Sequence, residues 1–160
     1  MSVIDLKNAT IKIKDGTGTP NELEINIGEG QMKFTEKRNI EYRRNRGVLD
    51  DVVEGDEEPM EVSLDFQWEF LKASSGDPPT IEDALKQRGG ASAWISSDTD
   101  TCRPYAVDIE ILYTPPCGSL EDETITLEDF RWESLDHDLK GASVSVTGKC
   151  NRTEATVVRS

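Results

Sequence analysis

Residues 60–70 alternate between apolar and polar side chains without interruption. Because successive side chains of a β-strand point to opposite faces, this period of two predicts a strand with one packed face and one wet face. At about 3.3 Å per residue the run would reach roughly 36 Å, about twice the length of an ordinary strand. The stretch therefore predicts a large antiparallel sheet. Trp68 is expected in its core, and the wet face carries a ladder of three carboxylates, Glu61, Asp65 and Glu69.

Other stretches with the same period predict the rest of the sheet. Residues 10–14 and 22–27 are expected to form an N-terminal hairpin, because turn-forming residues fill the segment between them. Further strands are expected at residues 31–36, 91–95, 105–113, 123–132, 141–150 and 155–158, with a bulge at Glu128-Asp129 and with Trp132 in the core.

One short helix is predicted over residues 81–88. Thr80 and Asp83 have the spacing of a capping box, and Gly89-Gly90 ends the helical pattern. The expected fold class is mainly β: an antiparallel β-sandwich or barrel with one short flanking α-helix, in a single domain over residues 1–160.

The formal net charge of −14, from 32 acidic and 18 basic side chains, argues against direct binding to nucleic acids or anionic membranes, which need a basic surface. An apolar content of 35% is low for a chain that must form its own core, so contacts with further copies could supply the difference. Residues 1–10 lack the features of a secretory signal, and no apolar run approaches the roughly 20 residues that span a membrane. We therefore expect a protein made and kept in a cytoplasm. Free thiols are favoured there for Cys102, Cys117 and Cys150, with a Cys102–Cys117 disulfide as the alternative.

Side chains that could carry catalysis or bind a metal are scarce. His137 is the only histidine, and nothing near it resembles the motif of a nucleophile. Asp136-His137-Asp138 and Asp98-Thr99-Asp100 lack the ligand spacing of a zinc site or an EF-hand, so both are expected to be solvated loops. We predict a protein that is not an enzyme, with no catalytic, cofactor-binding or metal-binding residues.

Two blocks of opposite charge stand back to back. The first is a basic patch that consists of Lys37, Arg38, Arg43, Arg44 and Arg46. The second is acidic and consists of Asp50, Asp51, Glu54, Asp56, Glu57 and Glu58. Gly47 and Pro59 bound the acidic block and predict an extended loop over 47–59, and such long loops are usually functional or disordered. The two blocks could pair within one hairpin, or they could meet their complements on neighbouring copies and build rings or open polymers.

Acidic side chains also recur on the polar faces of the predicted strands. Besides the ladder on residues 60–70, the faces carry Glu22, Glu24, Asp108 and Glu110. Two explanations remain open. These residues could form an ordinary solvated sheet face, or they could form a negative surface along which another molecule passes without being bound. For passing DNA, like charge would prevent capture of the phosphates.

The order of three segments resembles the tail tube protein, or major tail protein, of long-tailed (siphovirus-type) bacteriophages. The segments are Phe34-Thr35-Glu36-Lys37-Arg38-Asn39, then Arg46-Gly47-Val48-Leu49-Asp50-Asp51-Val52, then residues 54–66. The resemblance spans residues 11–150 and is sharpest over 46–66.

The resemblance implies a β-sandwich with a flanking helix that assembles into hexameric rings. The rings would stack around a tape measure protein, with tail terminator and tail tip proteins at the ends, and DNA would pass through the lumen without specific binding. The protein would then be part of the virion tail, assembled in the cytoplasm of the bacterial host. In that picture residues 47–59 act as an intersubunit loop through Gly47, Asp50, Asp51, Glu54, Asp56, Glu57 and Glu58, and the candidate lumen face carries Glu61, Asp65 and Glu69.

Two alternatives remain open. A ring protein of a phage-derived secretion or bacteriocin particle would share the fold and the sequence signals. A β-barrel that binds a small ligand, or that serves as an adhesin module, would have no need to polymerise.

Overall fold

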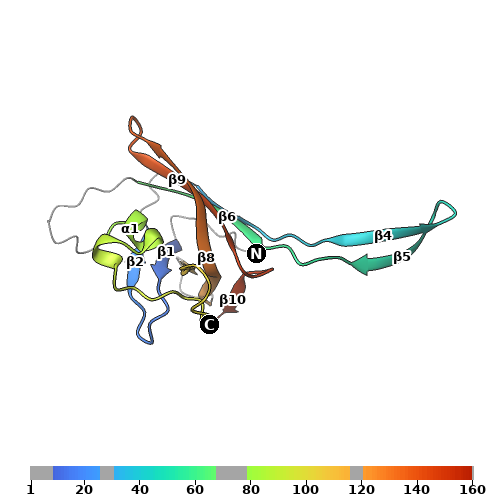
Figure 1. Cartoon of the computed structure of the whole chain (residues 1–160), viewed down its shortest axis with the longest axis horizontal. Coiled ribbons are helices and arrows are strands. Elements are labelled where there is room, and N and C mark those ends of the chain that lie inside the picture. Colours follow the sequence, from blue (N-terminus) through green and yellow to red (C-terminus); the bar gives the residue numbers. More distant parts are fainter. Residues whose placement is uncertain (1–8, 26–30, 68–78, 116–120, 160) are drawn as a thin grey trace.

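The computed structural model describes residues 9–25, 31–67, 79–115 and 121–159. An eight-stranded antiparallel sheet has the order β2-β1-β7-β8-β9-β6-β3, with β10 paired to β8, and β4 and β5 form a separate two-stranded sheet (Figure 1). The elements are β1 (Ala9–Lys14), β2 (Glu22–Glu24), β3 (Met32–Thr35), β4 (Ile40–Asn45), β5 (Val48–Glu54), β6 (Met60–Gln67), α1 (Ile81–Lys86), η2 (Gly89–Ala91), β7 (Val107–Tyr113), β8 (Glu123–Asp138), β9 (Ser143–Cys150) and β10 (Thr156–Arg159). The mainly antiparallel β fold with one short α-helix is confirmed. Of the helices in these segments, none has both the length and the apolar character needed to cross a lipid bilayer.

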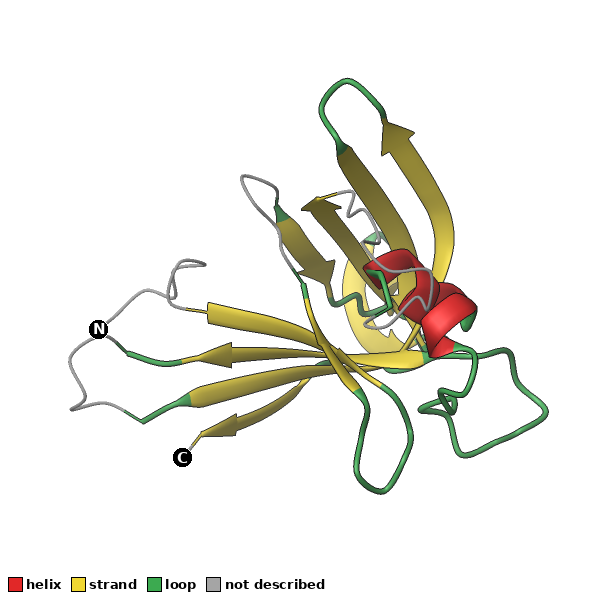
Figure 2. Ribbon diagram, turned by 90° about the vertical axis from the view of Figure 1, so that its left-hand side faces the viewer, coloured by secondary structure: helices red, strands yellow, loops and turns green. Residues whose placement is uncertain are grey.

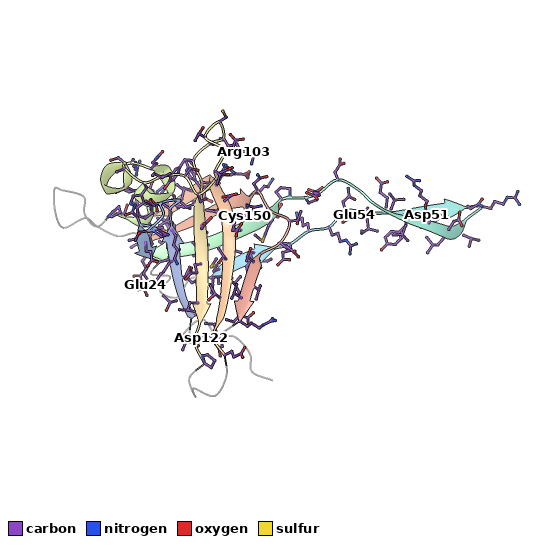
Figure 3. The ribbon with its side chains drawn as sticks, turned by 90° about the horizontal axis from the view of Figure 1, so that it is seen from below. Glu24, Asp51, Glu54, Arg103, Asp122 and Cys150 are labelled. Atoms are coloured by element: carbon purple, nitrogen blue, oxygen red, sulfur yellow. The ribbon has the colours of Figure 1, made fainter. Side chains whose placement is uncertain are left out.

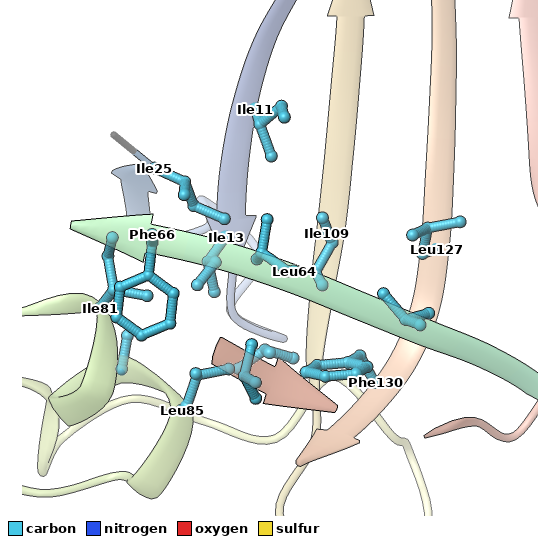
Figure 4. Close-up of a cluster of buried hydrophobic side chains, with 14 of the residues drawn as sticks. Ile11, Ile13, Ile25, Leu64, Phe66, Ile81, Leu85, Ile109, Leu127 and Phe130 are labelled. Atoms are coloured by element: carbon cyan, nitrogen blue, oxygen red, sulfur yellow. The ribbon is translucent and has the colours of Figure 1, made fainter. Parts of the chain in front are cut away.

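The core lies under β6, as its alternation predicts. Met60, Val62, Leu64 and Phe66 are buried, and the residues between them are partly or fully exposed. The sheet bends on itself, so that its strands run in two crossing directions with α1 beside them (Figure 2). This bend brings β6 over β1, β7 and β8, and their buried side chains meet it together with those of α1 (Figure 4): Ile11, Ile13, Ile81, Leu85, Ile109, Leu127 and Phe130. Trp68, Glu69 and Phe70 lie outside the described residues.

Strand β8 pairs with β7 and β10 along its first half and with β9 along its second half. The predicted bulge is confirmed: Val107 pairs with Phe130 and Ile109 with Leu127, so Asp108 faces both Glu128 and Asp129. Asp129 has a left-handed backbone (φ 58°), and its N–H donates to Oδ1 of Asp108 at 3.1 Å. The strand is longer than predicted, because it continues to Asp138 beside β9.

Two predictions fail where β8 passes α1. Trp132 is 38% exposed and lies against Lys86, whose Nζ is 5.3 Å from the ring centroid, so it is not a core residue. A second irregularity between Trp132 and Ser134 interrupts the alternation there. Asp136-His137-Asp138 is part of the strand and not a loop, and Nε2 of His137 lies 3.2 Å from Oε2 of Glu82 on α1.

The predicted helix is present and two residues shorter. The side chain of Thr80 accepts a hydrogen bond from the N–H of Asp83 at 3.2 Å, and Gln87 ends the helix with a left-handed backbone (φ 54°). The strand predicted over 91–95 is wrong. A 3₁₀ turn stands there, because the N–H groups of Ala91 and Trp94 bond to carbonyls three residues earlier.

We expect Gly148→Ala to lower the free energy of unfolding by about 1–3 kcal/mol. A Cβ at this position would overlap the carbonyl oxygen of Arg131 and would lie 2.8 Å from Cε2 of Phe130. Gly18→Ala is the control, because nothing lies within 4 Å of a Cβ placed there. Urea denaturation followed by circular dichroism measures both variants, and equal stability of the two would contradict the close packing at Gly148.

Candidate functional site

Strands β4 and β5 form a two-stranded ribbon that projects from the body of the protein (Figures 1 and 3). Its turn has positive φ at both central residues, 54° at Arg46 and 83° at Gly47, as a two-residue hairpin turn requires. The extended loop predicted over 47–59 is therefore wrong for residues 48–54, which form β5, and a loop remains only over 55–59. We call residues 40–54 the arm.

One face of the arm carries three exposed apolar side chains beside Arg44, and Val48 is exposed on the other face. The register pairs Tyr42 with Val52 and Arg44 with Leu49, and directly paired residues of an antiparallel ribbon share a face. Tyr42 is 64% exposed, Leu49 65% and Val52 59%. We call these three residues the apolar strip. A two-stranded hairpin alone is marginally stable in water, and a strip of this kind is typical of a surface that another molecule covers.

The charges of the arm pair only in part within the chain. At its base Nζ of Lys37 lies 2.9 Å from Oε1 of Glu61, and Nε of Arg38 lies 3.5 Å from Oε1 of Glu54. Towards the tip, the register places Arg43 opposite Asp51, but no carboxylate of the described residues comes within 4 Å of Arg43, Arg44 or Arg46. Pairing within one hairpin therefore accounts for Arg38 and Glu54, and the three arginines have no ion pair within the segments that the structure describes.

A cleft of about 380 Å³ lies at the base of the arm. Residues 36–39 and 55–58 run alongside each other there and are joined where the N–H of Gly55 donates to the carbonyl oxygen of Asn39 at 2.8 Å. Thr153 and Glu154 complete the lining. Six carboxylates line the cleft against two cations, so this end of the arm is strongly acidic: Glu36, Glu54, Asp56, Glu57, Glu58 and Glu154.

The candidate lumen face is less acidic than the sequence pattern suggests. Its pair with Lys37 lowers the pKa of Glu61, and Asp65 accepts a hydrogen bond from Oγ of Ser145 at 2.7 Å. The register also brings basic side chains onto this face, because Lys149 stands opposite Glu61 and Lys33 opposite Ser63. Glu69 lies outside the described residues. The described part of the face carries both signs of charge.

The acidic side chains at the other end of the sheet are largely paired. Nζ of Lys14 lies 2.6 Å from Oε2 of Glu110 and 3.2 Å from Oε1 of Glu22, and Lys12 lies 3.5 Å from Glu22. The hydrogen bond to Glu110 is the main cause that raises the pKa of Lys14. These carboxylates stabilise the junction of β2, β1 and β7, and Glu24 alone among them is exposed without an ion pair in the described segments.

Asp98 is a buried structural carboxylate, which corrects the expectation of a solvated loop. Its side chain accepts from the N–H of Asp100 at 3.0 Å and from Nη2 of Arg131 at 2.7 Å. These bonds lower the pKa of Asp98 to about 2. Sequence reasoning missed this site, because no local motif links Asp98 to Arg131 on β8.

The described segments hold no group of three or more His, Cys, Asp or Glu side chains placed to bind a metal ion. Cys102 is exposed and Cys150 is buried, and both are free thiols. Burial raises the pKa of Cys150 to about 12. Cys117 lies outside the described residues, so the alternative disulfide stays a prediction.

Asp108→Asn should raise the free energy of unfolding at pH 7.5. Burial raises the pKa of Asp108, and the nearby Asp129 and Glu128 carboxylates act in the same direction. Since the folded pKa lies above the unfolded one, stability is lost as the pH rises from about 4 through the folded pKa. Urea denaturation at pH 7.5 and pH 3 tests this, with the gain expected only at the higher pH. An equal gain at both would mean that ionisation of Asp108 does not oppose folding.

No protein-family model matches the sequence, and no curated protein matches it. Solved structures do match along nearly the whole chain. A chain of an extracellular contractile injection system, the PVC sheath/tube terminator in its extended state, is 13% identical with a TM-score of 0.57, over 99% of this chain and 98% of that one. A chain of the PVC sheath-tube complex has the same identity and a TM-score of 0.56, over 99% and 93%.

The anti-feeding prophage cap, which terminates the tube of that particle, is also 13% identical, with a TM-score of 0.53 over 100% of this chain and 93% of that one. These likenesses support the tail-tube-like fold that the sequence resemblance implies. They come from contractile particles, so they do not single out the siphovirus-type major tail protein. The fold of this chain is that of tube and tube-terminating components of phage-tail-like particles.

Proposed function

We propose that the chain is a structural subunit that assembles with copies of itself into stacked hexameric rings and so forms the tube of a phage-tail-like particle. The main support for this proposal is the arm. On a tail-tube-like fold, the arm exposes the apolar strip of Tyr42, Leu49 and Val52 away from the chain's own body. A contact between the arm of one copy and the surface of another is heterologous, and such contacts generate rings when the rotation closes.

The partners follow from the position of a tube in such a particle. A tape measure protein would occupy the lumen during assembly, and terminator and tip proteins would close the two ends. The face with Glu61 and Asp65 remains our candidate for the lumen lining. Because it carries both acidic and basic side chains, it would bind a passing polyanion or protein weakly. The proposal assigns the chain no catalytic step.

Two kinds of particle fit this role. One is the tail of a long-tailed bacteriophage, whose lumen conducts DNA. The other is a phage-derived contractile particle, in which a sheath would surround the tube. The similar structures are a sheath/tube terminator, a sheath-tube complex and a tube-terminating cap, and they favour the second kind.

Electron microscopy of the purified protein tests the proposal. The protein is applied to negative-stain grids over a series of concentrations, after its elution volume has been measured by size exclusion. Rings or hollow tubes with six-fold symmetry are the expected result. A monomer at every concentration, with and without salt, would contradict self-assembly and would favour the ligand-binding or adhesin alternative.

A further inference from the structure

The tip and the base of the arm carry opposite and unsatisfied charges. Arg43, Arg44 and Arg46 lie near the turn without an ion pair among the residues described. The cleft at the base holds five carboxylates that likewise lack a cation within 4 Å in the described chain: Glu36, Asp56, Glu57, Glu58 and Glu154. Its two cations are already engaged, Lys37 by Glu61 and Arg38 by Glu54.

These two surfaces cannot meet within one chain. The strands of the arm extend away from the body of the protein (Figure 1), and the cleft lies at the end of the arm next to the body. A six-residue strand such as β4 is about 20 Å long. The ribbon is paired along its whole length, from Ile40 opposite Glu54 to Asn45 opposite Val48, so the tip does not fold back on its base. The arginines of one copy can therefore reach only the cleft of another copy.

We propose that the arginines at the tip of the arm, Arg43, Arg44 and Arg46, dock into the acidic cleft at the base of the arm of a second copy of this chain. The inference rests on the proposed function and specifies its contact. The tip and the cleft are different surfaces, so an open assembly has one free tip at one end and one free cleft at the other until a ring closes. Guanidinium groups suit such a cleft, because they form charge-assisted and often bidentate hydrogen bonds with carboxylates.

The geometry also explains how the apolar strip becomes buried. Arg44 is paired with Leu49 and shares its face with Tyr42 and Val52. When Arg44 enters the cleft, this face turns towards the acceptor copy. Charge then sets the position of the arm, and the apolar strip supplies contact area.

A charge-exchange experiment tests the docking. The tip variant carries Arg43→Glu, Arg44→Glu and Arg46→Glu, and the cleft variant carries Asp56→Lys, Glu57→Lys and Glu58→Lys. Each variant alone is expected to stay monomeric in sedimentation velocity, at concentrations where the unmodified protein forms rings or tubes. Circular dichroism is expected to show both folded, because the six substituted side chains are exposed.

An equimolar mixture of the two variants is expected to recover assembly. The reversed tip then meets the reversed cleft, and the native tip of one variant meets the native cleft of the other, so the two alternate around a ring with an even number of subunits. A body variant with Glu24→Lys, Glu133→Lys and Asp136→Lys is the matched control, because it changes the net charge as much as the cleft variant does. Because its tip and its cleft are unchanged, the body variant is expected to assemble alone as the unmodified protein does.

The possible outcomes distinguish failure of the docking contact from failure of the proposed function. If the unmodified protein never assembles, the proposed function fails and the contact with it. If the unmodified protein assembles and both variants also assemble alone, the docking is wrong while the function stands. A body variant that stays monomeric alone would overturn the docking, because it would show that bulk charge, and not the cleft, governs the loss of assembly in the cleft variant. Failure of the tip and cleft mixture would mean that the cleft receives another basic segment.

Discussion

Replacing the apolar strip with serine, by Tyr42→Ser, Leu49→Ser and Val52→Ser, should abolish the assembly of rings and tubes without lowering the melting temperature of the body. Burial of one side chain of this size contributes about 1.5–3 kcal/mol. Since 1.4 kcal/mol is about a tenfold change in an equilibrium constant, loss of all three should raise the concentration needed for assembly by more than about 100-fold. The arm is a separate two-stranded sheet, so the eight-stranded sheet keeps its core.

The control for this prediction changes the opposite face of the same ribbon. Glu41→Ser and Asp51→Ser introduce the same residue type into β4 and β5, and both side chains lie on the face away from Tyr42. Light scattering over a concentration series measures the onset of assembly for each variant. An onset for the apolar-strip variant equal to that of the unmodified protein would mean that the strip makes no contact between subunits.

Phe130→Ala should lower the free energy of unfolding by about 3–5 kcal/mol, a large part of the 5–15 kcal/mol of a typical domain. Phe130 is 1% exposed and packs where β7, β8 and β9 meet. Trp132→Ala, two residues further along β8, removes a larger side chain that is 38% exposed, and we expect it to cost less. Urea denaturation of both variants compares them, and a greater loss for Trp132→Ala would show that the tryptophan is the better packed of the two.

The body of the fold could be predicted because its strands keep the same alternation of buried and exposed side chains along their length. In β6 and β7 every second side chain is buried, and the bulge at Asp129 is marked by two adjacent acidic residues where the apolar phase of β8 changes. Trp132 has the phase of a core residue, but the second irregularity of β8 and the nearby α1 leave its ring partly exposed. The exposure of that residue depends on tertiary packing that its neighbours in sequence do not encode.

The arm could not be predicted as a ribbon, because neither of its faces is buried by the chain itself. A register shift beside Arg43 and Arg44 leaves Asp50 unpaired and breaks the alternation of β5. Arg46-Gly47 is also a weaker turn signal than Asn-Gly or Asp-Gly. The charge blocks nevertheless marked the segment as one with a role outside the fold, and the unpaired arginines and carboxylates of the structure support that interpretation.

The pairing of β6 with β9 has a consequence for synthesis on the ribosome. It joins residues far apart in the chain, such as Asp65 and Ser145, which are separated by 80 positions. Contacts of this kind slow folding, and the exposed apolar surface of the waiting segments invites aggregation. While the chain is being made, the apolar side chains of β6 emerge long before β7, β8 and β9 exist to complete the core around them. A nascent chain of this protein must therefore stay incompletely folded until its last fifth is translated, which favours association with a chaperone during that interval.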